Sequence, residues 1–216
     1  MNIEKKLTQI WIGPKPAPVK WMHTWRDKHP DWEYSIFTDD MLKARKWHNQ
    51  HLIWHYYNTK KWPGVSDLIR YELLYEQGGF WPEADMTCLE NTDELFTAPK
   101  HHAYSCFENE KGRGNNIQPI MACNPGNEFV KHVIDTLHEV LPHRLSPEPF
   151  RSTGNAFLAQ HVPKFRDMLT IWPSHYFIPL FYIGGAKRYD GPDKVYADHK
   201  WGSTGHANSI AYDKAI

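Results

Sequence analysis

The sequence predicts an α/β fold: a single-domain sandwich with a mostly parallel central sheet flanked by helices. Strand-like and helix-like segments alternate along most of the 216 residues, a pattern typical of helices packed on one sheet. The chain is 41% hydrophobic and 23% charged, which is the composition of a folded globular protein. No internal repeat or low-complexity linker divides it, so we expect one domain over residues 1–216.

The opening segments predict a β-α-β unit. Residues 7–12 alternate apolar and polar before a Gly-Pro-Lys-Pro-Ala-Pro stretch, as expected for a strand followed by a loop. Apolar residues at helical spacing follow from 19 to 25, and His-Pro-Asp at 29–31 ends that helix. Residues 33–37 then predict a short strand that ends at Thr-Asp-Asp, 38–40. This order is typical of nucleotide-binding domains.

Residues 41–62 are polar, aromatic and rich in histidine. His48, His51 and His55 would share one face of a helix. A zinc site is a weak alternative, because no Cys, Asp or Glu lies beside them at ligand spacing. We therefore expect a solvated helix that carries histidines.

The next helix is predicted to begin with Ser66 as its N-cap and to end at Gly78-Gly79. Its buried stripe would be Leu68, Ile69, Leu73 and Leu74. Residues 80–86 then predict a strand that starts apolar and becomes acidic at an exposed end.

The remaining elements continue the alternation. An amphipathic helix is predicted from Phe129 to Leu141, capped by Asn127, stopped by Pro142 and serving only for packing. Short strands are predicted at 103–107, 117–123, 170–172 and 195–197.

Composition and charge exclude several function classes. Lys plus Arg equal Asp plus Glu at 25 each, and the basic residues are scattered, so we expect no nucleic-acid partner. The three cysteines, Cys88, Cys106 and Cys123, argue against a disulfide framework and for a reducing compartment. No apolar stretch approaches the roughly 20 residues of a membrane helix, and the first residues do not resemble a signal peptide. A soluble cytoplasmic protein, or one peripheral to a membrane, is expected.

Glu83 and Asp85 are the strongest local signal for chemistry. On an extended segment they would point the same way and offer two hard oxygen ligands to Mg²⁺ or Mn²⁺. A solvated turn is the alternative, and the tripeptide alone favours it. Asp67 and Arg70 share one face in the first turns of the preceding helix, where an ordinary ion pair would explain both.

Residues 65–85 as a whole resemble the signature of the DXD-containing glycosyltransferases of family 32. The shared pattern is a Ser-Asp-Leu-x-Arg-Tyr helix, a Gly-Gly stop and a DXD strand. The similarity extends to residues 9–13, 29–34, 152–154 and 198–203 and so covers roughly the whole chain. This family includes the yeast initiating α-1,6-mannosyltransferase and capsule-synthesis enzymes, and the large clostridial glucosylating toxins have a similar core.

The resemblance implies a GT-A fold that binds a nucleotide sugar with Mn²⁺ or Mg²⁺. Residues 1–90 would be the nucleotide-sugar half, and residues 91–216 the acceptor half with a C-terminal element for metal and diphosphate. The implied metal ligands are Glu83, Asp85 and His199, although a surface histidine is an equal alternative for the last. The implied donor-binding residues are Gln9, Trp11, Ile12, Asp67, Arg70, Glu83, Ala84, Trp201 and Ser203, and the implied catalytic residues are Asp67, Arg70 and Asp85.

The implied roles differ along the donor. Trp11 and Ile12 would line the nucleobase pocket, Asp67 and Arg70 would hold sugar hydroxyls, and Trp201 with Ser203 would close over the diphosphate. Two departures from the family pattern affect this scheme. Glu83 replaces the first Asp of the DXD motif, and the C-terminal element lacks its final tryptophan.

The implied function is a metal-dependent, retaining transfer of a hexose to a glycan, lipid or protein. UDP-hexoses such as UDP-glucose are the favoured donors and GDP-mannose the next. Acceptor binding is expected at residues 41–62 and at the glycine-containing loop 108–116. The lack of an anchor favours a microbial or viral cytosolic enzyme.

Other classes fit less well. A glycoside hydrolase needs two carboxylates that flank a sugar, whereas Glu83 and Asp85 would share one strand face. A metal-dependent phosphatase or nuclease would need further carboxylates, and only Asp39 and Asp40 are offered, which more simply end a strand. A lectin-like module or a degenerate transferase stays as the main alternative.

Overall fold

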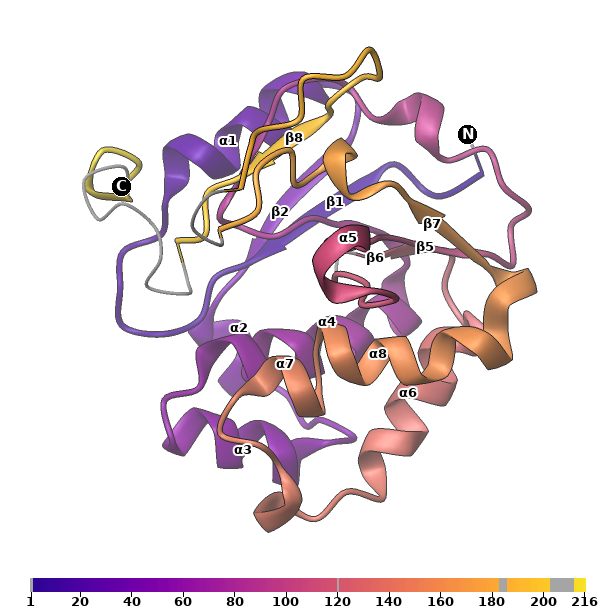
Figure 1. The fold of residues 1–216 in the computed structure, drawn as a ribbon. Coiled ribbons are helices and arrows are strands. Elements are labelled where there is room, and N and C mark those ends of the chain that lie inside the picture. Colours follow the sequence, from indigo (N-terminus) through magenta and orange to yellow (C-terminus); the bar gives the residue numbers. More distant parts are fainter. Residues whose placement is uncertain (1, 120, 183–185, 203–211) are drawn as a thin grey trace.

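A six-stranded sheet in the order β2-β1-β3-β6-β5-β7 forms the middle layer of the computed structural model (Figure 1). The structure describes residues 2–119, 121–182, 186–202 and 212–216. Only β6 runs against its neighbours, so the sheet is mostly parallel, as predicted. Its strands are β1 (Lys6–Ile10), β2 (Glu33–Phe37), β3 (Gly79–Trp81), β5 (Ala103–Cys106), β6 (Met121–Cys123) and β7 (Leu169–Trp172). Strands β4 (Met86–Cys88) and β8 (Ala197–His199) pair separately as an antiparallel ribbon.

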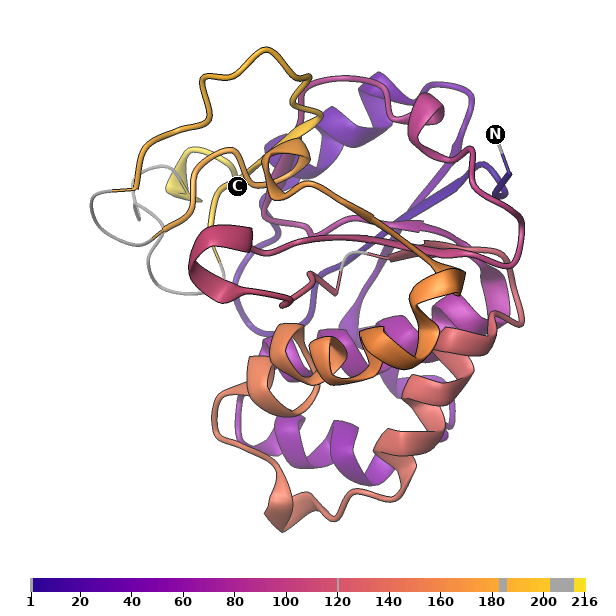
Figure 2. The ribbon, with the colours of Figure 1, turned by 45° about the vertical axis from the view of Figure 1, so that its right-hand side comes forward.

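Helices and the small ribbon cover the two faces of the sheet. Figures 1 and 2 show α4, α6 and α8 on one face, and α1 on the other beside the ribbon. The helices are α1 (Val19–Lys28), α2 (Asp39–Lys43), α3 (Gln50–Asn58), α4 (Trp62–Gln77), α5 (Glu110–Arg113), α6 (Glu128–His138), α7 (Pro149–Ser152) and α8 (Asn155–His161). Short 3-10 turns lie at Asp93–Leu95, Pro142–Arg144, Val162–Met168 and Ser174–Tyr176.

Alternating side chains of the strands build a hydrophobic core on each face. Phe80 and Tyr104 pack with Trp25 of α1, whereas Trp81 and Ala103 pack with the helices of the opposite face. Successive residues of a strand point to opposite sides, so each strand serves both cores. The alternation predicted along the chain therefore produces three layers.

Glycines allow β3 to lie directly beside β1. Gly78 ends α4 with a φ of 64°, and Gly79 follows with a φ of 86°. A Cβ on Gly79 would lie 2.6 Å from the backbone oxygen of Lys6, so only glycine fits here. The Gly-Gly stop predicted from the sequence thus sets the entry of the chain into β3.

Several predicted boundaries were wrong for identifiable reasons. α4 begins at Trp62 and not at Ser66, because Pro63 occupies its first turn and starts the helix earlier. The segment 41–62 is not one solvated helix but α2, a loop and α3, whose Leu52, Ile53 and Tyr56 are buried.

Smaller shifts affect the later elements. Of the described residues in the strand predicted at 117–123, Met121–Cys123 form β6, while Ile117 makes an isolated bridge to Phe107. The strand predicted at 195–197 lies at Ala197–His199, and α6 ends at His138, before the predicted stop. Within the described ranges, no helix combines the length and apolarity needed to cross a bilayer.

Candidate functional site

The acidic segment after β3 lies at the carboxyl ends of the parallel strands β1 and β3. It is not the extended, exposed strand end that the sequence predicted: Ala84 and Asp85 form a turn between β3 and β4, and Asp85 is only 4% exposed. The carboxyl edge of parallel strands is where open α/β sheets bind ligands. The turn therefore brings two carboxylates to the expected edge of the sheet.

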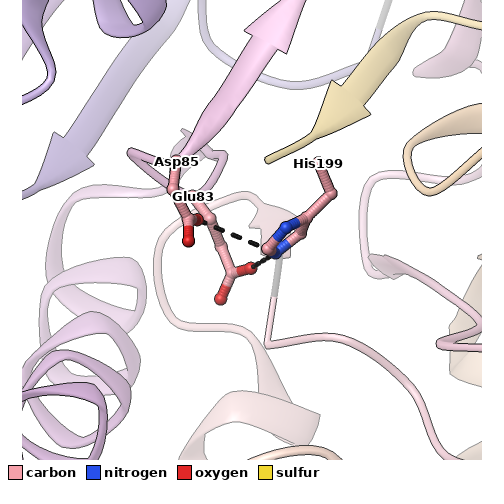
Figure 3. A group of neighbouring side chains, drawn as sticks. All are labelled: Glu83, Asp85 and His199. Carbon is pink, nitrogen blue, oxygen red and sulfur yellow. Dashed lines mark hydrogen bonds and ion pairs between the residues drawn. The ribbon is translucent and has the colours of Figure 1, made fainter. Parts of the chain in front are cut away.

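Glu83, Asp85 and His199 converge into one cluster (Figure 3). The Nε2 atom of His199 lies 2.8 Å from a Glu83 oxygen and 3.7 Å from an Asp85 oxygen. One ligand atom from each residue lies within 4.8 Å of the others. Carboxylate oxygens and an imidazole nitrogen are a donor set that suits Mn²⁺, so these residues fit the metal implied by the sequence.

Pairing between β4 and β8 brings His199 to the carboxylates. Met86 is in register with His199, and the backbone N–H of Lys200 donates to the Asp85 carbonyl at 2.8 Å. The N–H of Trp201 points at Nδ1 of His199, which leaves Nε2 facing the carboxylates. His199 is therefore a buried member of the cluster and not a surface histidine.

Charges within the cluster shift its pKa values in opposite directions. Burial would raise the pKa of Glu83, but the hydrogen bond from His199 and the charges of His199 and Arg70 hold it below its usual value. Burial would lower the pKa of His199, but Asp85 and Glu83 raise it above the usual value. The polar Nε2 side of the His199 ring, which faces both carboxylates, thus partly offsets their mutual repulsion.

Gln9 lies behind the cluster and orients its backbone. The fully buried Gln9 amide donates to the Glu83 carbonyl oxygen at 3.1 Å and accepts from the Tyr34 hydroxyl at 2.9 Å. It does not line the neighbouring cavity. Sequence similarity placed Gln9 at the donor, whereas its contacts are with the protein.

Asp67 and Arg70 are brought together with the cluster but do not form the simple intrahelical pair. Nη1 of Arg70 donates to the Pro119 carbonyl at 2.6 Å and lies 3.9 Å from Glu83. Asp67 accepts a hydrogen bond from the Thr153 hydroxyl at 3.0 Å. Burial raises the pKa of Asp67 to about 7, although Arg70 and Thr153 act against this shift. Such a perturbed, buried carboxyl is typical of functional sites.

A cavity of about 190 Å³ opens beside the cluster. Its lining combines the apolar side chains of Ile10, Trp11, Ile12 and Trp62 with the more polar segment of Asp67, Arg70, Glu83, Ala84 and Asp85. Three further residues line it that the sequence did not place at the donor: Lys15, Trp62, which was expected in the acceptor region, and Ser66, which was expected only as a helix cap. Gly13 lies against the Trp62 ring with a φ of 111°, and a Cβ there would meet the ring at 2.9 Å; the sequence shows the glycine but not this contact.

Residues near the C-terminus contact both the cluster and Trp11. Trp201 stacks on the His199 ring with centroids 3.9 Å apart and lines a second cavity. Ser203 lies outside the described residues. Beyond that gap, Tyr212 stacks on Trp11 at a centroid distance of 6.1 Å. Of the histidines at 48, 51 and 55, the first two contact His138 of α6 through their rings.

Comparison with known proteins gives these features a family context. Residues 18–101 match the model of the glycosyltransferase sugar-binding region containing DXD motif. Two curated proteins of Schizosaccharomyces pombe are similar. Inositol phosphoceramide mannosyltransferase 3 is 27% identical over 143 residues, covering 62% of this chain and 37% of its own. Inositol phosphoceramide mannosyltransferase 1 is 26% identical over 221 residues, which cover 95% of this chain and 63% of the length of that protein. The chain thus spans less than two thirds of either relative.

Solved structures share the fold at low sequence identity. The PaToxG glycosyltransferase has a TM-score of 0.61 at 16% identity, over 77% of this chain and 70% of its own. The ligand-free glycosyltransferase domain from the YGT toxin has a TM-score of 0.52 at 10% identity, over 78% and 80%. A glycosyltransferase involved in glycosylation of the major capsid of PBCV-1 has a TM-score of 0.50 at 12% identity, over 97% and 98%. These similarities support the GT-A fold predicted from the sequence.

Proposed function

Because the chain is a DXD-type glycosyltransferase domain with a GT-A fold, we propose that it transfers a hexose from a nucleotide sugar to an acceptor hydroxyl with a divalent metal. The observation that carries the proposal is the convergence of Glu83, Asp85 and His199 beside a cavity that Glu83 and Asp85 line together with apolar side chains. A nucleoside diphosphate has the matching polarity, with a flat base at one end and charged phosphates at the other.

Different residues would contact different parts of the donor. Trp11, Ile12 and Trp62 offer flat apolar walls for the base, and the carboxylates with His199 would hold Mn²⁺ or Mg²⁺. When bound, the ion would offset the charge of the diphosphate as it leaves. Asp67 and Arg70 would contact the sugar, since they line the cavity next to Glu83. Ser203 is proposed at the diphosphate on the resemblance alone.

The transfer itself needs positioning more than covalent chemistry. The acceptor oxygen forms a bond to the anomeric carbon while the bond from that carbon to the phosphate oxygen breaks, and the departing phosphate takes the hydroxyl proton. Retention of configuration by front-face attack is part of the proposal. Arg70, with an Nε that lacks a hydrogen-bond partner in the described part of the chain, is suited to stabilise charge here.

The donor is proposed as GDP-mannose, with UDP-glucose as the second choice. The two curated relatives are named as mannosyltransferases, which reverses the order predicted from sequence. Their names describe inositol phosphoceramide as the acceptor, so a lipid carrying a hydroxylated headgroup is one acceptor class to test. A glycan or protein acceptor is the other.

Thermal shift measurements test the donor site directly. Purified protein is heated with GDP, UDP and dTDP in Mn²⁺ or EDTA, because a ligand that binds only the native state raises the melting temperature. We expect a shift of several degrees with one nucleotide, lost in EDTA and in Asp85→Asn. Asp135→Asn, the same change at an exposed site on α6, serves as the matched control.

Turnover completes the test. The wild type should release free mannose or glucose slowly from the matching nucleotide sugar when Mn²⁺ is present, and Asp85→Asn should not. Activity that persists in EDTA would contradict metal dependence. Binding without any turnover would support the lectin-like or degenerate alternative.

A further inference from the structure

A second cavity, of about 150 Å³, adjoins the first at the metal cluster. Pro63, Asp67 and Glu83 line both cavities, so the two spaces meet where the sugar of the donor would lie. His199 and Trp201 line the second cavity as well. A ligand in it would therefore reach the reacting centre.

The first cavity is lined by residues proposed for the base, the metal and the sugar of the donor, while the third proposed metal ligand, His199, lines the second cavity. Trp11 and Ile12 serve the base, Glu83 and Asp85 the metal, and Asp67 and Arg70 the sugar, and all of these line the first cavity. Among the described residues that line the second cavity, none belongs to the apolar base-binding walls. If the proposed function holds, this second space is left for the other substrate.

Largely buried polar side chains line the second cavity. Glu108 is 7% exposed, Gln118 3% and Asn155 9%. Burying such groups costs free energy unless they find partners. Aromatic rings of Phe150, Tyr182 and Trp201 complete the wall. Flat rings beside buried amides and a carboxylate suit a ring that bears hydroxyl groups on its edge and C–H groups on its faces.

Glu108 has the greatest capacity for hydroxyl donors. Asn116 donates to its carboxylate at 3.1 Å, and the Asn155 amide also acts on it. Burial raises the pKa of Glu108, with the charge of Glu83 adding to the shift, while Asn116, Arg113 and Asn155 oppose it. A carboxylate accepts about four hydrogen bonds, so two amides leave room for hydroxyl groups.

Arg113 supplies a donor to the same cavity. Its Nη2 donates to the Tyr182 hydroxyl at 3.0 Å, and its guanidinium lies 6.0 Å from the centre of the Phe150 ring. Its buried Nε has no hydrogen-bond partner in the described part of the chain. A buried unpaired donor costs free energy, and a hydroxyl oxygen of a ligand would satisfy it.

We propose that the second cavity is the acceptor subsite and that it binds a polyhydroxylated ring, a hexose or a cyclitol, through Glu108, Asn155 and Arg113. These three residues come from different segments: the loop after β5, the start of α8 and α5. Together these residues would select the acceptor, and none of them would bind the donor. The loop 108–116, predicted as an acceptor contact, contributes two of the three.

The experiment separates transfer to a ring from hydrolysis of the donor by water. The wild type and variants receive the nucleotide sugar with Mn²⁺, first alone and then with methyl α-D-mannopyranoside, methyl α-D-glucopyranoside or myo-inositol. We expect transfer to at least one probe. Glu108→Gln should raise the KM for that probe at least tenfold while donor hydrolysis stays within twofold. The probe that reacts distinguishes a hexose from a cyclitol.

Two further variants provide a second test and a control. Arg113→Lys retains the charge but removes Nε, and it should also raise the probe KM selectively if Glu108→Gln fails to fold. Glu128→Gln, the same change at an exposed position of α6, should alter nothing.

Two results would overturn the proposal. One is equal loss of hydrolysis and transfer in Glu108→Gln, which would assign the cavity to the donor. The other is a wild type that hydrolyses the donor but transfers to none of the three rings. A wild type without metal-dependent hydrolysis would instead contradict the proposed function.

Discussion

His199 and Glu83 are hydrogen-bonded at 2.8 Å although 116 positions separate them in the chain. The β4–β8 ribbon holds the imidazole in place, because Met86 and His199 are paired in register. The longer side chain of Glu83 spans the remaining distance to the ring. The departure from Asp at the first DXD position is therefore matched to the position of His199.

Glu83→Asp tests that match. Shortening the side chain by one methylene should break the contact with His199, since the ribbon cannot follow, and we expect Mn²⁺ affinity to fall about tenfold, as when partners of metal sites are removed. Calorimetric titration of Mn²⁺ measures the change, and Glu128→Asp, at an exposed position of α6, is the control. Unchanged or tighter Mn²⁺ binding in Glu83→Asp would show that the length of Glu83 is not used.

Asp67→Asn should stabilise the fold while it weakens activity. The pKa of Asp67 is about 7 in the folded protein, above the ordinary 3.8, so the buried carboxylate favours unfolding above pH 7. Removing the charge should add up to about 4 kcal/mol to the free energy of unfolding at pH 8. The gain should shrink as pH falls from 7 to 4, where the carboxyl is protonated in the fold.

Denaturant unfolding at pH 8 and pH 4.5, together with donor hydrolysis at pH 8, checks this prediction. The Thr153 hydroxyl, which donates to the Asp67 carboxylate in the wild type, can still donate to the amide oxygen of the variant, so the fold should persist. A variant that is less stable than the wild type at pH 8 would mean that Asp67 is a structural residue.

His29 should make stability depend on pH in mildly acidic solution. Its Nδ1 faces the Trp25 carbonyl at 2.9 Å, and its Nε2 accepts the Thr92 N–H at 3.0 Å. Burial lowers its pKa below 6.5, and a proton on Nε2 would remove the acceptor for Thr92. The stabilising effect of neutral His29 is complete above pH 6.5 and is lost as pH falls through 6.5 toward the folded pKa.

Comparison with His29→Gln isolates this effect from the other histidines. The wild type should lose up to about 1.4 kcal/mol more per pH unit than the variant below pH 6.5. The variant should be less stable at pH 8 but flatter in its pH dependence. Parallel curves for the two proteins would exclude His29 as the titrating group.

Tyr212 should position Trp11 for the nucleobase. Its ring stacks on Trp11, its hydroxyl donates to the Pro16 carbonyl, and the edge of Trp21 packs against it. We expect Tyr212→Ala to weaken nucleoside diphosphate binding about tenfold and to leave binding of Mn²⁺ with pyrophosphate unchanged, because only the former uses the base. Tyr212→Phe retains the stacking ring and should bind nearly as the wild type. Equal weakening for both ligands would indicate a purely structural role.

The local elements around the site were predictable from the sequence. Helical periodicity, the Gly78-Gly79 stop and the acidic pair Glu83 and Asp85 all depend on residues close in the chain. Asn127 was likewise recognised as a cap, and its side chain accepts from the Val130 N–H at 3.2 Å. Such signals arise from backbone geometry and side-chain spacing, which a short segment contains in full.

Only the tertiary structure decided which side chains meet. Gln9 donates to the Glu83 carbonyl, Asp67 accepts from Thr153, and His199 contacts the carboxylates. In each case the partners are distant in sequence. Trp62 and Lys15 reached the cavity in the same way. These meetings depend on strand register and on the packing of α4 against the sheet, and neither is encoded within a single segment.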